Sequence, residues 1–223
     1  MWQNYINAFR IEDVLQILSD KQNSARVIAG GTDLILEMER GVRKGINTLI
    51  DISRIPGLAK IVLDEDSIIH IGPAVTHNDC ISSALLREQA FPLVNACWEV
   101  GSPQIRNRGT VAGNLITASP ANDTIPALIA LDAVVTLMSK RGKRNIRLED
   151  FYLGVRKTVM QPDEMLVDIS FHGMEKHHKG VFQKNALRRA QAISVVNTAI
   201  LLKFEGDNSK KIQSARLAYG SVS

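Results

Sequence analysis

A pair of glycines stands near the start of the chain, in the segment Ala29–Leu34, which reads Ala-Gly-Gly-Thr-Asp-Leu. Glycines between a strand and a helix let a ligand approach the backbone closely, and successive N–H groups there favour a phosphate. The segment has neither the G-x-G-x-x-G pattern of Rossmann folds nor the Gly-Lys-Ser/Thr ending of P-loops. Alone, such a glycine pair is more often a tight turn than an anion site, so the segment by itself is a weak indication of ligand binding.

A second segment, Gly109–Asp123, combines small residues, hydroxyls, amides and one carboxylate. It is too polar for a core element and too apolar for a solvated tail. It suits a buried polar ligand, with backbone donors for phosphate and Asp123 for ribose-type hydroxyls. A long surface loop is the alternative. Two such segments more than seventy residues apart favour a long ligand in a cleft between two structural units.

The elements that must position the first segment follow from apolar spacing in residues 1–57. Ile11, Val14, Leu15 and Leu18 predict a helix. Strands are expected at Arg26–Ala29 and Thr48–Ile52, on either side of a short helix over Thr32–Arg40, with Thr32 or Asp33 as N-cap and Gly41 at its end. These residues are predicted to form a small β/α unit.

Residues 58–172 are predicted to form a second unit, and residues 173–223 a linker and an incomplete C-terminal domain. Helices and strands follow one another without regular βαβ alternation, which predicts an α+β fold. The expected helices are His77–Arg87, capped by Thr76, Phe91–Val100 and Pro126–Leu131. The expected strands are Ser67–Ile71, Val134–Met138, Asn145–Leu148, Met165–Phe171, Ser194–Phe204 and Lys211–Tyr219, with a polar linker at His172–Lys179 and a turn at Glu205–Lys210.

Composition excludes several classes of protein. The net charge of +4 is spread over 223 residues, which argues against a nucleic-acid-binding surface. Cys80 and Cys97 are expected to be buried thiols, and two cysteines cannot supply the four ligands of an iron–sulfur cluster. The start has no secretion signal, and no apolar stretch approaches eighteen residues, so a cytoplasmic location without a membrane span is expected.

The two glycine-bearing segments closely resemble the FAD-binding loops of the molybdopterin dehydrogenase FAD-binding family. That family includes flavin domains of xanthine dehydrogenase and medium subunits of carbon monoxide dehydrogenase. The resemblance covers nearly the whole chain, with further matches at Gly101–Gly109, Ala130–Ala133, Pro162–Leu166 and Phe182–Arg189. It implies the two-subdomain FAD-binding fold of the vanillyl-alcohol oxidase and CO dehydrogenase flavoproteins. Members continue past Gly220 into a longer C-terminal domain.

Carried over by position, the resemblance implies a set of FAD-binding residues. The first loop comprises Val27, Ile28, Ala29, Gly30, Gly31, Thr32, Asp33 and Leu34, and the second comprises Thr110, Val111, Ala112, Gly113 and Asn114. Further expected contacts are Val100, Asp123, Leu166 and Lys184. Ala112 stands where many members have glycine, and alanine fits there if its φ is negative. Gly30→Val and Gly113→Val are expected to prevent FAD binding and to leave the fold largely intact.

The resemblance further implies an oxidoreductase component that is inactive in full turnover without partners. A molybdopterin-binding large subunit and an iron–sulfur small subunit carrying two-iron two-sulfur clusters are the expected partners, with NAD or another acceptor receiving the electrons. Two alternatives stay open: a stand-alone FAD-dependent oxidoreductase, and an assembly module that has lost the cofactor. No general acid or base is assigned, because the cofactor performs flavin chemistry.

Other residues have competing interpretations. Arg106 and Arg108 could bind phosphate or a partner's acidic surface, or could simply be solvated or tie down the second segment. Trp98 is expected to lie in the core rather than to stack on a flavin. His172, His177 and His178 are interpreted as part of a solvated linker rather than as metal ligands, because no fixed spacing relates them to a further ligand.

Overall fold

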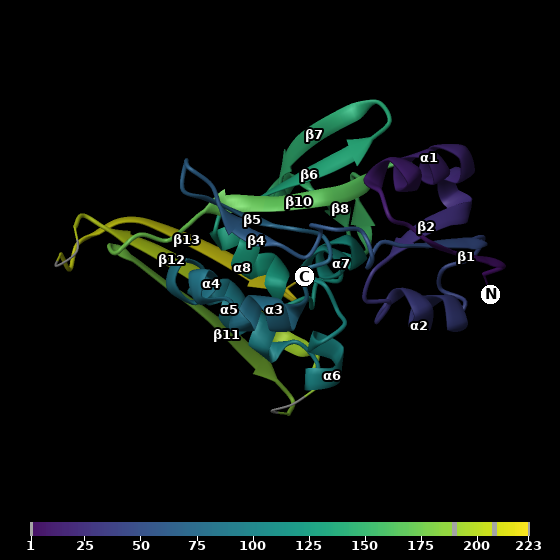
Figure 1. Ribbon diagram of the computed structural model, residues 1–223. Coiled ribbons are helices and arrows are strands. Elements are labelled where there is room, and N and C mark those ends of the chain that lie inside the picture. The colour runs from purple at the N-terminus through teal and green to yellow at the C-terminus, as the bar shows by residue number, and fades with distance from the viewer. Residues whose placement is uncertain (1, 189–190, 207–208, 223) are drawn as a thin grey trace.

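A parallel sheet of three strands forms the N-terminal part of the computed structural model, which describes residues 2–188, 191–206 and 209–222. Its order is β1-β3-β2, with β1 at Asn4–Asn7, β2 at Ala25–Ile28 and β3 at Thr48–Asp51. Helices α1 (Ile11–Lys21) and α2 (Leu34–Glu39) lie on opposite faces of it (Figure 1), and the turn η1 (Gln22–Ser24) precedes β2. The helices and strands predicted for this region are confirmed.

The second sheet has five antiparallel strands in the order β4-β5-β10-β6-β7. These are β4 (Ile61–Leu63), β5 (Ile68–Ile71), β6 (Val134–Ser139), β7 (Gly142–Arg147) and β10 (Met165–His172). Between β7 and β10 come the turn η2 (Leu148–Asp150) and a small hairpin of β8 (Tyr152–Gly154) and β9 (Lys157–Thr158). Strands β4, β8 and β9 were not predicted, because each has only two or three residues and too little alternation to detect.

Short helices pack on this sheet and enclose the main core. They are α3 (His77–Ser82), α4 (Ala84–Gln89), α5 (Phe91–Glu99), α6 (Pro103–Arg106), α7 (Val111–Thr117) and α8 (Thr124–Ala130). The single helix predicted over His77–Arg87 is wrong. Ser83 has extended backbone angles and caps α4 by accepting the N–H of Leu86. Thr76 caps α3 as predicted.

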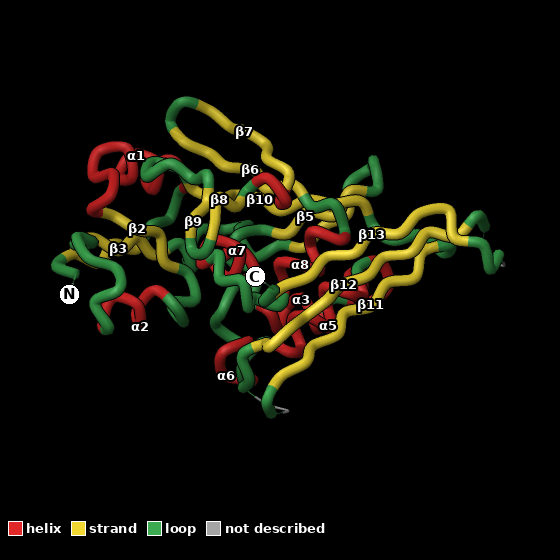
Figure 2. The backbone as a smooth tube through the Cα atoms, turned by 180° about the vertical axis from the view of Figure 1, so that it is seen from behind, coloured by secondary structure: helices red, strands yellow, loops and turns green. Residues whose placement is uncertain are grey.

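A third, antiparallel sheet contains β11 (His178–Ala186), β12 (Ser194–Phe204) and β13 (Ile212–Gly220). It packs on α5 and α8, so these helices lie between the second and third sheets (Figure 2). All but one of the buried residues in this contact are alanines, which allows the helices and the sheet to pack closely: the cluster is Ala96, Ala127, Ala130, Phe182, Ala199 and Ala218. The α+β class is confirmed, whereas β11 was not predicted as a strand.

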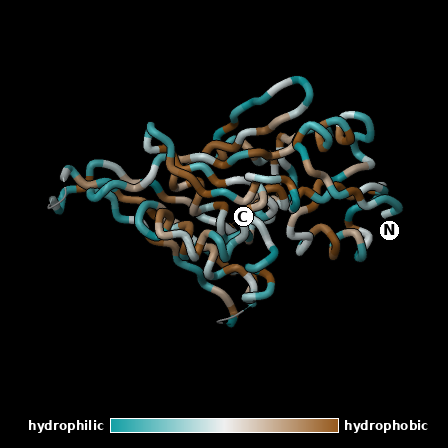
Figure 3. Tube along the Cα trace, in the orientation of Figure 1, coloured by the Kyte–Doolittle hydropathy of each residue, from teal (hydrophilic) through white to brown (hydrophobic). Residues whose placement is uncertain are grey.

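Hydrophobic residues concentrate in the strands of the second sheet and in the helices beneath it, whereas the tip of the β6–β7 hairpin is hydrophilic (Figure 3). Cys80 and Cys97 are buried free thiols, as predicted. Within the described residues, no helix combines the length and the apolar character that crossing a bilayer requires. Arg189 of the Phe182–Arg189 match, and residues 207–208 of the predicted turn, lie outside the described residues.

Candidate functional site

A cavity of about 320 Å³ lies between the parallel sheet and the helices and strands of the second unit. Its size falls in the range typical of small-molecule sites. Both glycine-bearing segments line it, although they are far apart in the sequence. Of the predicted binding residues, the cavity is lined by Val27, Ile28, Ala29, Gly30, Gly31, Thr32, Asp33, Leu34, Val100, Thr110, Ala112, Gly113, Asn114 and Leu166.

The first segment is a turn between β2 and α2. Gly31 adopts a φ of +71°, which is strained for residues with side chains. Within the described part of the chain, the backbone N–H groups of Gly30, Gly31 and Thr32 donate no hydrogen bond. Buried or cleft-facing N–H groups are normally paired, so three unpaired donors in succession are suited to an anionic ligand. This observation fits the phosphate interpretation and weakens the simple-turn alternative.

Packing against the second segment gives a separate reason for a glycine at position 30. A Cβ at this position would lie 2.0 Å from the carbonyl oxygen of Arg108, in the backbone just before the second segment. The two segments therefore touch directly, and the absence of a side chain at position 30 permits the contact. The expectation that Gly30→Val would leave the fold largely intact is consequently not supported, because the valine would first separate the segments.

The second segment contains helix α7, and the prediction of an irregular, non-core stretch there is wrong. Thr110 is the N-cap, and its hydroxyl accepts the N–H of Gly113 at 3.0 Å. Small polar residues obscured the helix in the sequence, yet Val111, Ala112 and Leu115 are at most 2% exposed. Ala112 lies within this helix, where φ is negative, so an alanine fits at the position where many family members have glycine. It also lines the cavity. Val111 faces the core and does not line the cavity.

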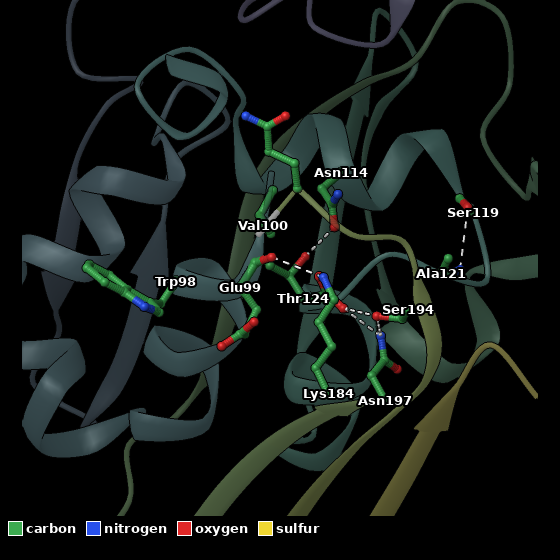
Figure 4. Close-up of polar contacts among 12 residues, drawn as sticks. Trp98, Glu99, Val100, Asn114, Ser119, Ala121, Thr124, Lys184, Ser194 and Asn197 are labelled. Carbon is green, nitrogen blue, oxygen red and sulfur yellow. Dashed lines mark hydrogen bonds and ion pairs between the residues drawn. The ribbon is translucent and has the colours of Figure 1, made fainter. Parts of the chain in front are cut away.

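Asp123 and Lys184 also lie outside the cavity lining. Their side chains are each 5% exposed, and Lys184 Nζ lies 2.7 Å from Asp123 Oδ2. Asp123 also accepts hydrogen bonds from Ser194 Oγ at 2.6 Å and Asn197 Nδ2 at 2.8 Å. Figure 4 shows Lys184, Ser194 and Asn197 pointing toward one another. The geometry thus joins the loop before α8 to β11 and β12, and a cofactor contact by either residue remains a prediction.

This buried cluster adjoins the cavity through a neighbouring residue. Asn114, which lines the cavity, accepts a hydrogen bond from Thr124 Oγ1 at 2.6 Å, and Thr124 follows Asp123 directly (Figure 4). Lys184 Nζ also donates to the carbonyl of Glu99 at 3.0 Å, next to Val100 on the cavity wall. The third sheet is therefore bonded to Glu99 and Asp123, which are sequence neighbours of Val100 and of Thr124, the partner of Asn114.

Charged residues that were not singled out in the sequence surround another part of the cavity. Glu37 is buried and pairs with Arg43 of its own unit and with Arg156 of the β8–β9 hairpin. The second pair connects α2 to the second unit. Desolvation, followed by repulsion from Glu37, raises the pKa of Asp33 above its usual value. Asp33 occupies the N-cap position of α2, but its side chain makes no capping hydrogen bond, contrary to the expectation for a capping residue.

His77 is another lining residue that the sequence did not indicate, because a lone histidine after a capping threonine has no distinctive pattern. It is 2% exposed, and its Nδ1 is buried without a hydrogen-bond partner in the described residues. Its backbone N–H donates to the carbonyl of Gly109 at 3.1 Å. Desolvation, together with the nearby charge of Arg106, lowers the pKa of His77 to about 4, so its ring is neutral at pH 7.

Arg106 anchors the turn beside the cavity. It is 9% exposed and donates to the carbonyls of Trp98 and Val100 at 3.1 and 3.2 Å. This arginine therefore fixes the backbone at the end of α5 rather than the second segment, so it is neither simply solvated nor bound to that segment. Trp98 is 60% exposed, so its prediction as a core residue is wrong. Its ring lies 5.0 Å from the Arg106 guanidinium, a cation–π distance.

The predicted linker contains one further group of polar side chains. Glu175, His177 and His178 place possible metal-ligand atoms within 4.8 Å of one another, which the sequence interpretation did not anticipate. Nδ1 of His178 already accepts the backbone N–H of Glu175 at 2.9 Å. This group lies outside the cavity lining.

A cleft between a parallel β/α unit and an α+β unit, with unpaired backbone donors on a glycine turn, is the arrangement expected of proteins that bind phosphate-bearing ligands between two units. The chain belongs to the family of the FAD binding domain in molybdopterin dehydrogenase, whose model matches residues 2–171. The family predicted from the sequence is thereby confirmed.

Sequence similarity to individual proteins supports the family assignment. The chain is 37% identical over 182 residues to the nicotinate dehydrogenase FAD-subunit of Eubacterium barkeri, which covers 80% of this chain and 61% of that subunit. It is 29% identical over 218 residues to the putative xanthine dehydrogenase FAD-binding subunit of Escherichia coli, covering 97% of this chain and 73% of that protein. It therefore spans only part of the length of these relatives.

A solved structure confirms the predicted fold type. Carbon monoxide dehydrogenase from Hydrogenophaga pseudoflava contains a chain that superposes with a TM-score of 0.93 at 26% identity. The match covers all of this chain and 76% of that one. The CO dehydrogenase flavoprotein type expected for the fold is thus observed.

Proposed function

We propose that this chain binds FAD in the cavity between its first two sheets and serves as the flavin component of a molybdenum-containing dehydrogenase or hydroxylase. The unpaired N–H groups of Gly30, Gly31 and Thr32 carry the proposal, since they match the needs of a diphosphate. Family membership and the names of the relatives, which are FAD subunits of dehydrogenases, support the choice of FAD.

The roles of the residues follow from their positions. The glycine turn and the start of α7 hold the diphosphate, while apolar residues such as Val100 and Leu166 shield the cleft from water. The ion pair between Glu37 and Arg156 holds the two units together beside the ligand. When bound, FAD supplies one- and two-electron transfer, and the protein contributes binding and orientation.

The proposal extends to the complex. Partner subunits carry the molybdopterin cofactor and two-iron two-sulfur clusters, and this chain connects those clusters to NAD or another acceptor, in the cytoplasm. Support comes from relatives named as FAD-binding or medium subunits of xanthine, nicotinate and carbon monoxide dehydrogenases. Residues 1–57 and 58–172 form the two FAD-binding subdomains in this proposal, and residues 173–223 form a linker and part of a C-terminal domain.

Titration of the purified chain with FAD, followed by flavin absorbance and fluorescence, tests the cofactor assignment. Saturable binding in the micromolar range or tighter is expected, and circular dichroism shows whether the chain is folded. A folded chain that binds no FAD at high micromolar concentration would leave the assembly-module alternative. If FAD binds, NADH is then added to the loaded chain without partner subunits. Steady turnover under these conditions would favour the stand-alone oxidoreductase over a component that depends on partners.

A further inference from the structure

His77 is the buried histidine of the cavity wall, and the position of its ring relates it to both glycine-bearing segments. A Cβ built on Gly109 would lie 3.4 Å from His77 Cδ2 and also 3.4 Å from Thr32 Oγ1. Cδ2 is bonded to Nε2, so this edge of the imidazole faces the place where the glycine turn meets the backbone before α7. His77 is one of the residues that line the cavity.

The two ring nitrogens are in different surroundings. Nδ1 is buried and has no partner among the described residues, and Nε of Arg106 is likewise buried without a partner. The Arg106 charge acts directly on the imidazole. A neutral imidazole holds one proton, which can stand on either ring nitrogen. A proton on Nε2 stands on the edge of the ring toward Gly109 and Thr32, where a ligand in the cavity can accept it.

We infer that His77 is a neutral hydrogen-bond donor to the bound dinucleotide, with Nε2–H directed at its diphosphate. This inference rests on the proposed FAD function. A neutral donor is compatible with the adjacent Arg106, whereas a second cation in this buried place would be repelled. A hydrogen bond to a charged group is among the stronger ones, so its loss corresponds to about tenfold weaker binding or more.

Three purified variants test the inference: His77→Leu, which removes the donor, His77→Gln, which keeps an amide N–H at similar reach, and His172→Leu as a control. His172 is an exposed histidine at the end of β10 and does not line the cavity. Dissociation constants for FAD and for riboflavin, which has no phosphate, are measured by flavin fluorescence, and circular dichroism verifies folding.

We expect His77→Leu to weaken FAD binding about tenfold and to leave riboflavin binding unchanged, while His77→Gln recovers most of the FAD affinity and His172→Leu has no effect. Equal affinity of wild type and His77→Leu for FAD would overturn the inference. So would an equal loss for FAD and riboflavin, or a His77→Gln variant as weak as His77→Leu, since either would indicate a structural role. Failure of the wild-type chain to bind FAD would instead refute the proposed function.

Discussion

The buried pair of Lys184 and Asp123 allows a structural role to be separated from a cofactor role. Lys184→Met keeps most of the side-chain volume but leaves the Asp123 carboxylate buried without its cation. Removal of one partner of a buried pair costs about 3–5 kcal/mol. Asp123 keeps its hydrogen bonds from Ser194 and Asn197, so the lower end, about 3 kcal/mol, is expected. The cost is high because both side chains are only 5% exposed.

Urea unfolding followed by circular dichroism measures this loss, and a second substitution defines its cause. Asp123→Asn in the Lys184→Met background removes the unpaired charge and should restore about 1–2 kcal/mol, a coupling typical of contacting residues. Lys211→Met is the control, because Lys211 and Glu205 form a pair with side chains 76% and 45% exposed. It should cost less than about 0.5 kcal/mol. A Lys184→Met loss below about 1 kcal/mol, with weaker FAD binding, would refute the structural reading and favour direct cofactor contact.

Three further outcomes are expected. The pKa of about 4 for His77, against an unfolded value of 6.5, means that the unfolded chain binds an extra proton between these values, so stability falls as pH decreases from 6.5 to 4. Urea unfolding at several pH values should show His77→Gln losing about 3 kcal/mol less than wild type over this window, and parallel curves would contradict the assignment. Gly30→Ala should lower the free energy of unfolding by about 1–3 kcal/mol, because its Cβ would lie 2.0 Å from the Arg108 carbonyl oxygen. Gly206→Ala is the control and should change the free energy of unfolding little, because no atom lies within 4 Å of its Cβ. Equal effects of the two substitutions would argue against the contact between Gly30 and Arg108. Glu37→Gln should cost about 1 kcal/mol and weaken FAD binding, since it removes the charge that joins the two units; unchanged values in urea unfolding and FAD titration would show that the bridge is dispensable.

Local patterns in the sequence predicted most of the framework. Helix α1 follows from the spacing of Val14, Leu15 and Leu18, and the cap at Thr76 follows from its position directly before the helix predicted to begin at His77. Such features depend on neighbours a few residues away, so they can be recognised without the fold. The two glycine-bearing segments were located for the same reason.

The family resemblance supplied what local patterns lacked, namely that the two segments belong to one FAD site. It did not predict that Thr110–Asn114 begins a helix, because small polar residues hide the buried face formed by Val111, Ala112 and Leu115. Nor did it indicate the exposure of Trp98, which depends on how α5 packs rather than on its own residues.

The sequence by itself thus determined most of the longer helices and strands, the position of the glycine-bearing segments and the family. Only the tertiary structure decided how the segments meet: Gly30 lies against Arg108, His77 enters the cavity wall beside Gly109, and Lys184 pairs with Asp123. Each contact joins residues at least thirty positions apart. Chain folding sets such distances, and no periodicity or capping signal encodes them, because those signals extend over only a few residues.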